Sequence, residues 1–261
     1  MQKNSESNKR IKLYHLVAAA LLTAVSVAMA PLNIYIPLFG VSSLRFSVTD
    51  IPIFICGVLF GPILGAISGF IGDIVGFVVA PGGPYFPGFT VNKILVGLIP
   101  GMLFYLQHRG KNLEQGMIKK INGGLAIFAL VGAAFYINVI AIEEVKAVGT
   151  VFSMPLNVVL TIGMILSVII LAMIVKKISG VFEKKEGIYN LQVIIMAVSL
   201  NYIVVNLCLT PIWMYCLYNM PVFVSVTARM FKSMIDVPLQ VTICYMVLQA
   251  IPVKVRQKIT C

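Results

Sequence analysis

The chain alternates between long apolar runs and short charged clusters. Eight apolar runs can be separated: Leu13 to Ala30, Ile51 to Leu59, Ile63 to Ala80, Phe89 to Leu106, Ile121 to Ile142, Pro155 to Val175, Leu191 to Tyr218 and Val222 to Ile251. Most are close to the roughly 20 residues that a helix needs to cross a bilayer. The second run is short and ends at Phe60-Gly61-Pro62, where proline disfavours helix in the residue before it. The pattern predicts an all-α integral membrane protein with eight spans, in which Ile51 to Ala80 forms a tight helical hairpin.

The composition supports a membrane protein. The 261 residues are 59% hydrophobic and 11% charged, whereas a soluble domain carries roughly 25% charged residues. A soluble globular protein is therefore excluded, and so is a disordered chain, which needs low hydrophobicity and high charge. The net charge of +11 raises nucleic-acid binding as an alternative, so the positions of the basic residues have to decide.

The basic residues cluster on one side of the predicted spans. If the N-terminus is cytoplasmic, 15 of the 20 Lys and Arg residues lie on the cytoplasmic side, and only Arg45 and Lys146 lie in the outer loops. Cytoplasmic loops of membrane proteins carry such an excess. We therefore expect both termini in the cytoplasm of a multi-pass cell-membrane protein that contacts lipid and binds no nucleic acid. Residues 1–12 form a basic tail, and residues 13–261 form one membrane domain.

The first run also imitates a secretory signal. Its apolar stretch ends in Ala28-Met29-Ala30, which has the form of a cleavage site. Pro31 would directly follow the cut, which disfavours cleavage, and the run is about long enough to span. We expect a retained first helix.

Four polar positions follow one face of the last run. Arg229, Lys232, Asp236 and Gln240 recur at i, i+3, i+7 and i+11, which places them on one helical stripe. An ionisable side chain within the bilayer is costly, so this stripe must face protein or water. It is interpreted either as a ligand site or as a set that pairs internally, with Asp236 as a structural ion-pair residue. Pro238 predicts a kink in the same helix, just below the stripe.

A second charge lies on a ridge of small residues. Gly61, Gly65, Gly69 and Asp73 are spaced by four residues, which allows close helix packing. Lys93 enters the following run from the same outer end, so Asp73 is interpreted as its ion-pair partner. A catalytic acid is disfavoured, because an aspartyl intramembrane protease would need a second Asp in a matching motif.

Aromatic residues gather in an outer loop. Residues 81–90 hold three Pro and three Gly, which cannot continue a helix, and Tyr85, Phe86 and Phe89 then stand on a preformed turn. Such a loop suits the wall of a site for a planar ligand, with an interfacial aromatic belt as the alternative. Trp213, the single Trp, follows Asn206 at helical spacing in the seventh run.

The first run has a stripe of small residues. Ala20, Ala24 and Ala28 repeat every four residues, which lets another helix approach closely. This face is either an internal packing surface or a partner-docking surface.

Motifs for catalysis are missing from the sequence. There is no phosphate-binding G-x-x-x-x-G-K-[ST] and no G-x-S-x-G or H-E-x-x-H. The five Cys lack C-x-x-C spacing, and the two His lie apart near charged stretches, so no metal site is expected. The sequence thus predicts no catalytic residues and no cofactor. Any energy source must be a partner or an ion gradient.

Several stretches together resemble the S components of energy-coupling-factor (ECF) vitamin transporters, in particular the folate-type branch. The resemblance lies in Arg45-Phe46-Ser47 with Asp50-Ile51-Pro52-Ile53, Leu59-Phe60-Gly61-Pro62 with Gly72-Asp73, and Gly83 to Thr90, and downstream in Asn206 to Trp213 and Arg229 to Pro238. It implies a six-helix membrane protein that captures a vitamin, here folate, near the outer face. It further implies delivery by tilting against a transmembrane coupling protein driven by two ATPase subunits.

The resemblance also implies roles for individual residues. Ten are expected to contact substrate: Arg45, Tyr85, Phe86, Phe89, Thr90, Lys93, Asn206, Trp213, Arg229 and Lys232. The cations would balance the glutamate tail of folate, and Trp213, Tyr85 or Phe89 would stack on its pterin ring. Ala20, Ala24 and Ala28 would dock on the coupling protein.

The main departure from the family pattern is residues 121–177, which predict a helical pair inserted between core helices four and five. The fold expected is thus a six-helix S-component core with a two-helix insertion. Three alternatives stay open: an S component for another vitamin, an ion-coupled secondary carrier that uses Asp73 and Asp236, and an intramembrane enzyme.

Overall fold

The computed structural model describes residues 13–38, 41–108 and 191–251, with short pieces between them at 116–118, 120–125, 127, 150–151, 154–155, 158, 162, 166, 169 and 173. Its elements are α1 (Leu13–Ala28), η1 (Ala30–Leu32), β1 (Ile34–Leu38), β2 (Val41–Phe46), α2 (Asp50–Phe60), α3 (Pro62–Val79), α4 (Pro87–His108), β3 (Thr150–Val151), β4 (Met154–Pro155), α8 (Leu191–Asn201), η3 (Tyr202–Leu209), α9 (Thr210–Tyr218) and α10 (Val222–Ala250).

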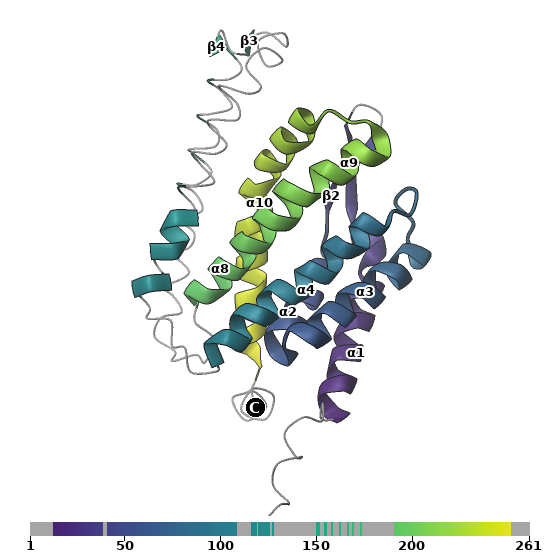
Figure 1. Ribbon diagram of the computed structural model, residues 1–261, viewed down its shortest axis with the longest axis vertical. Coiled ribbons are helices and arrows are strands. Elements are labelled where there is room, and N and C mark those ends of the chain that lie inside the picture. The colour runs from purple at the N-terminus through teal and green to yellow at the C-terminus, as the bar shows by residue number, and fades with distance from the viewer. Residues whose placement is uncertain are drawn as a thin grey trace, which may run out of the picture.

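A bundle of helices forms the body of the molecule (Figure 1). The six apolar runs outside residues 121–177 all correspond to helices within a few residues of the predicted bounds. Among the described residues, α3, α4 and the continuous α8–η3–α9 segment are long and apolar enough to cross a membrane, and α10 is a fourth if its two bent halves form one span. Both α1 and α2 are shorter apolar helices. The predicted inserted pair at 121–177 lies mostly outside the described residues and stays a prediction.

A small β-hairpin was not predicted. β1 and β2 pair antiparallel, with Tyr35 opposite Arg45, a small addition to the otherwise helical fold that was predicted. It is rich in β-branched and aromatic residues, and such residues favour strands, but it is too short for a span. The hairpin lies at the end of the bundle away from the start of α1 and the end of α10 (Figure 1).

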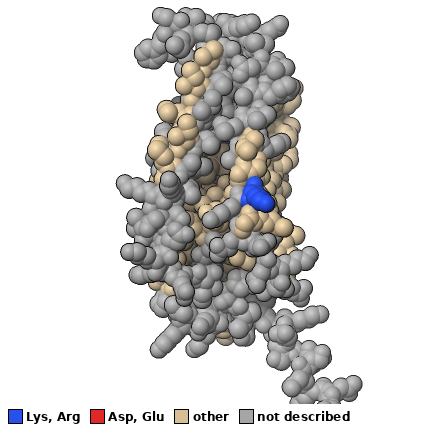
Figure 2. Space-filling view, turned by 90° about the vertical axis from the view of Figure 1, so that its left-hand side faces the viewer, with Lys and Arg blue, Asp and Glu red and all other residues tan. Residues whose placement is uncertain are grey.

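The second helix lies at the centre of the bundle. Its residues from Ile51 to Leu59 are all buried, because α1, α3, α4 and α10 contact it from different sides. A helix that is apolar on every face is expected in such a position. By contrast, α1 and α3 expose large apolar side chains such as Leu13 and Val78. Figure 2 shows one side of the molecule, where much of the surface belongs to residues that are not described and the described residues in view are almost all uncharged.

Glycines set the distance between α2, α3 and α4. A Cβ built on Gly57, Gly65 or Gly97 would collide with backbone atoms of the glycines opposite, and one on Gly69 would collide with the backbone of Lys93. The predicted glycine ridge is therefore a packing surface along which backbones touch. At the turn between α2 and α3, Gly61 has φ +87°, a conformation that glycine adopts readily, and the predicted tight hairpin is confirmed.

The last helix bends in its middle. Its segments Val224–Met230 and Ile235–Ala250 meet at 48°. Pro238 lacks an N–H, and its ring crowds the carbonyl four residues earlier, so the bend falls in the turn that precedes it. The kink predicted from Pro238 is present, but it lies within the stripe, between Arg229 and Asp236, rather than just below it.

The glycine contacts make a stability prediction. Gly97→Ala should lower the free energy of unfolding by about 1–3 kcal/mol or more, because the new methyl group meets the backbone of Gly65, which has little freedom to move. Thermal unfolding in detergent measures the effect. Gly124→Ala is the matched control, since nothing lies within 4 Å of a Cβ there. Equal melting temperatures for the two variants would contradict the interpretation.

Candidate functional site

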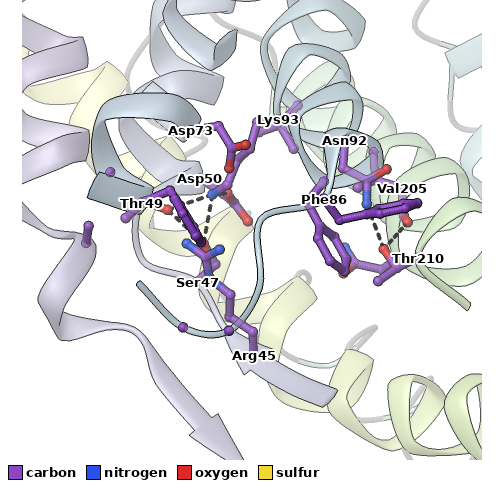
Figure 3. Close-up of a pocket in the computed structure, with 18 of the residues that line it drawn as sticks. Arg45, Ser47, Thr49, Asp50, Asp73, Phe86, Asn92, Lys93, Val205 and Thr210 are labelled. Atoms are coloured by element: carbon purple, nitrogen blue, oxygen red, sulfur yellow. Dashed lines mark hydrogen bonds and ion pairs between the residues drawn. The ribbon is translucent and has the colours of Figure 1, made fainter. Parts of the chain in front are cut away.

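A cavity of about 170 Å³ opens at the end of the bundle that carries the β-hairpin. Its walls come from η1, β2, η3 and α9, from the loop between α3 and α4, and from the nearby ends of α2, α3, α4 and α10. Eight of the residues predicted to contact substrate line it: Arg45, Tyr85, Phe86, Phe89, Lys93, Asn206, Arg229 and Lys232. Figure 3 shows charged side chains gathered on one wall and Phe86 and Asn92 on the other.

The ammonium group of Lys93 is held entirely by the protein. It forms an ion pair with Asp50 and donates hydrogen bonds to Thr49 Oγ1 at 2.7 Å and Ser47 Oγ at 3.1 Å (Figure 3). An ammonium group has three donors, and these acceptors use all of them. Lys93 thus ties the start of α2 to α4, and its expected role in balancing a ligand's charge is not supported by this geometry.

The predicted partnership between Asp73 and Lys93 was wrong. Gly69 packs against the backbone of Lys93, so Asp73, one turn further along α3, lies level with Thr90 rather than with Lys93. Asp73 Oδ2 accepts a hydrogen bond from Thr90 Oγ1 at 2.8 Å. Asp50, whose position at the start of α2 faces Lys93, takes the place assigned to Asp73. The sequence placed Asp50 in a matching motif but gave no sign of this pairing.

The two cations of α10 are anchored within their own helix. Lys232 Nζ lies 2.7 Å from Asp236 Oδ2 and 5.2 Å from the ring centroid of Phe46. Arg229 Nη1 donates to Ser225 O at 2.9 Å, and Tyr202 donates to the carbonyl of Arg229 at 2.6 Å. Asp236 is therefore in an ion pair, and both cations are fixed at the cavity wall.

Positive charge exceeds negative charge at the cavity. The lining holds the cations Arg45, Lys93, Arg229 and Lys232 and the acids Asp50 and Asp73. Asp236 adds a third carboxylate behind Lys232. One net positive charge in a partly closed site favours an anionic ligand, because the low dielectric of the walls strengthens the attraction.

The aromatic loop forms part of the wall, as predicted. Tyr85 packs edge-on against Phe77, with ring centroids 5.4 Å apart, and Phe86 lies 5.9 Å from Phe89. Thr90 does not line the cavity. It is buried below Tyr85, whose hydroxyl lies 2.9 Å from Thr90 Oγ1.

The single tryptophan stands behind this wall. Trp213 is absent from the cavity lining, so its expected stacking on the ligand is not supported. Its ring packs 5.8 Å from Phe86, and its Nε1 donates to Asn92 Oδ1 at 3.1 Å. It therefore supports the residue that does line the cavity.

Asn92 is a cavity residue that the sequence analysis missed. Its Nδ2 donates to Thr210 Oγ1 at 3.0 Å, and Thr210 Oγ1 in turn donates to Val205 O at 2.6 Å. These bonds join α4 to the π-helix η3, which precedes Pro211. The wider helical turn accommodates a proline that cannot donate to the ladder. An asparagine preceding a lysine carried no distinguishing signal in the sequence.

The alanine face of α1 points outward. Ala20, Ala24 and Ala28 are exposed, whereas Ala19, Thr23 and Ser26 form the buried face. This exposure favours the partner-docking interpretation of the stripe over internal packing, and the docking role stays a prediction.

Among the described residues, no group of three His, Cys, Asp or Glu side chains could hold a metal ion.

Comparisons with known proteins bear on the identity of the chain. The model of a family described as "ECF-type riboflavin transporter, S component" matches residues 10–178. The folate transporter FolT of Clostridium novyi (strain NT) is 39% identical over 62 residues, which are 24% of this chain and 36% of FolT. The matched part thus spans about a third of that relative.

A solved structure of FolT bound with folic acid is similar to the whole fold. It matches with a TM-score of 0.52 at 22% identity, over 91% of this chain and 93% of that one. At this identity the likeness shows a shared fold.

The Lys93–Asp50 contact predicts a large structural effect. Lys93→Met should lower the free energy of unfolding by about 3 kcal/mol, because removal of one partner leaves a partly buried charge uncompensated. Asp50→Asn should have a similar effect, and the double variant should lose less than the sum of the two, as thermal unfolding would measure. Additive losses would show that the two groups act independently.

Proposed function

This chain belongs to the family of S components of ECF-type transporters, and on that premise we propose that it captures folate for an ATP-driven vitamin importer. As a member of this family it is a multi-pass membrane subunit of a transporter, not an enzyme. The observation that supports folate as the ligand is the net positive charge of the cavity. Folate is an anion with a planar ring, so the cations of α10 suit its glutamate tail and the aromatic loop suits its ring.

Riboflavin is the second candidate, because the matching family model carries that name. It has a planar ring but no carboxylate. Two buried cations line the cavity, Arg229 at 3% and Lys232 at 7% exposure. A neutral ligand would give them little electrostatic stabilisation. The 62-residue match to a relative named as a folate transporter supports the same preference.

The proposal is tested by the ligand that the purified chain retains and binds. We expect a mass in the folate range after extraction, and tighter calorimetric binding of folic acid than of riboflavin. Arg229→Ala should weaken folic acid binding about 10-fold or more, on the scale of a charged hydrogen bond.

Riboflavin binding is the internal control for that variant, because a neutral ligand should lose little with Arg229. Tight binding of riboflavin without binding of folic acid would refute the folate assignment. A folded Arg229→Ala variant with normal folic acid affinity would show that this cation is structural.

The orientation and the partners belong to the same proposal. The excess of Lys and Arg in the predicted cytoplasmic segments supports cytoplasmic termini, which would put the cavity at the outer face. Protease protection of a terminal tag in intact cells tests this orientation. The partners are the transmembrane coupling protein and two ATPase subunits of the ECF module. The exposed stripe of Ala20, Ala24 and Ala28 is their docking surface, because small side chains let a partner helix approach closely.

A bulky residue on this stripe should separate binding from transport. Ala24→Trp should retain folic acid affinity, since Ala24 lies outside the cavity lining, but should reduce copurification with the coupling protein and uptake. Leu21→Trp is a matched control on the same helix, because Leu21 is already large and 63% exposed. Equal loss of uptake in both variants would argue against a specific role for the alanine stripe.

A further inference from the structure

Asp73 is a carboxylate that takes part in neither of the two ion pairs found among the described residues. It lies on α3, lines the cavity and is half-buried. Lys93, the nearby cation on α4, already donates to Asp50, Thr49 and Ser47. An ammonium group has no fourth proton, so Asp73 is not held as its partner.

The orientation of Asp73 is fixed by a short chain of hydroxyl groups. Thr90 Oγ1 donates to Asp73 Oδ2 at 2.8 Å, and Tyr85 therefore donates to Thr90 across 2.9 Å. Within the described part of the chain this is the one hydrogen bond that Asp73 accepts. A carboxylate offers about four acceptor positions. Its other acceptor positions take no hydrogen bond from the described residues, and Asp73 lines the cavity beside Lys93 (Figure 3).

A carboxylate at the wall of a net-positive cavity selects for a ligand with two unlike ends. The cations Arg229 and Lys232 enter from α10, whereas Asp73 enters from α3 beside the aromatic residues Phe77 and Tyr85. Anionic groups of a ligand are attracted to Arg229 and Lys232 and repelled by the carboxylate of Asp73. This carboxylate accepts hydrogen bonds from N–H groups on a planar ring.

We propose that Asp73 is a specificity-determining residue that accepts two hydrogen bonds from adjacent N–H donors of the ligand's heterocycle. The inference rests on the proposed function and defines the ring end of its ligand. The 2-amino-4-oxo ring of folic acid presents such a pair, its ring N3–H and its 2-amino group. A flavin presents a single ring N–H between two carbonyls, and these carbonyl oxygens would face the carboxylate. Paired charge-assisted bonds favour the first ring, and repulsion disfavours the second.

Asp73→Asn tests this role with little change in shape. The amide oxygen can still accept from Thr90, but the amide nitrogen is a donor and cannot accept the second ligand hydrogen bond. Calorimetry with three probes locates the effect: folic acid, free pterin and its tail fragment N-(4-aminobenzoyl)-L-glutamate. Affinity for folic acid and pterin should fall about 10-fold or more. Affinity for the tail fragment should not change.

Two further variants complete the design. Arg229→Ala should give the reciprocal pattern, with weaker binding of the tail fragment and unchanged binding of pterin. Thr90→Val, which removes the hydroxyl that orients Asp73, should give a smaller loss with the ligand pattern of Asp73→Asn.

The possible failures are distinguishable. Normal pterin affinity in a folded Asp73→Asn variant, or an equal loss for the tail fragment, would overturn the role of Asp73 and leave the folate assignment standing. Binding of riboflavin and not of folic acid by the unaltered chain would refute both.

Discussion

Backbone contact between glycines on α2, α3 and α4 is the constraint on which the site depends. Because Gly57, Gly65 and Gly97 touch without intervening side chains, the three helices have little freedom to slide past one another. That register decides which polar groups meet at the open end of the bundle. Gly69 lies against Lys93, and the pairing of Thr90 with Asp73 one turn away follows from it.

The charges within the bundle divide into two kinds. The ammonium group of Lys93 is saturated by Asp50 and by the hydroxyls of Thr49 and Ser47, and this pair holds the start of α2 against α4. Arg229 and Lys232 are anchored on one side and border the cavity on the other. Burying either ion of the first kind alone would be costly. The two ions are therefore expected to stay paired and to hold the helices in position. The second kind is placed where an anion arriving from water meets it.

The apolar runs, and the Gly-Pro and charged breaks between them, were enough to predict these helices. Apolar runs gave six of them, and Gly61-Pro62 gave the hairpin turn. The sequence also brought the aromatic loop and most of the cations to one site, because all were expected at the same end of their helices. The features that the sequence did not predict depend on the rotation of each helix about its axis and on the register between neighbouring helices. Asp50 and Asp73 are equally plausible partners for Lys93 until the depth of the glycine contact is known, and Trp213 is one ring behind Phe86 rather than in front of it. The β-hairpin was missed because its strands, of 5 and 6 residues, are far shorter than a membrane span.

The position of Trp213 has a spectroscopic consequence. It is the single Trp of the chain, and it lies against Phe86, which lines the cavity, while its indole N–H is held by Asn92. Its fluorescence is therefore a built-in reporter of this one wall. Pterins and flavins absorb in the region where indole emits, so an occupied cavity should quench that emission by energy transfer. The residue that supports the site from behind makes occupancy visible without any label.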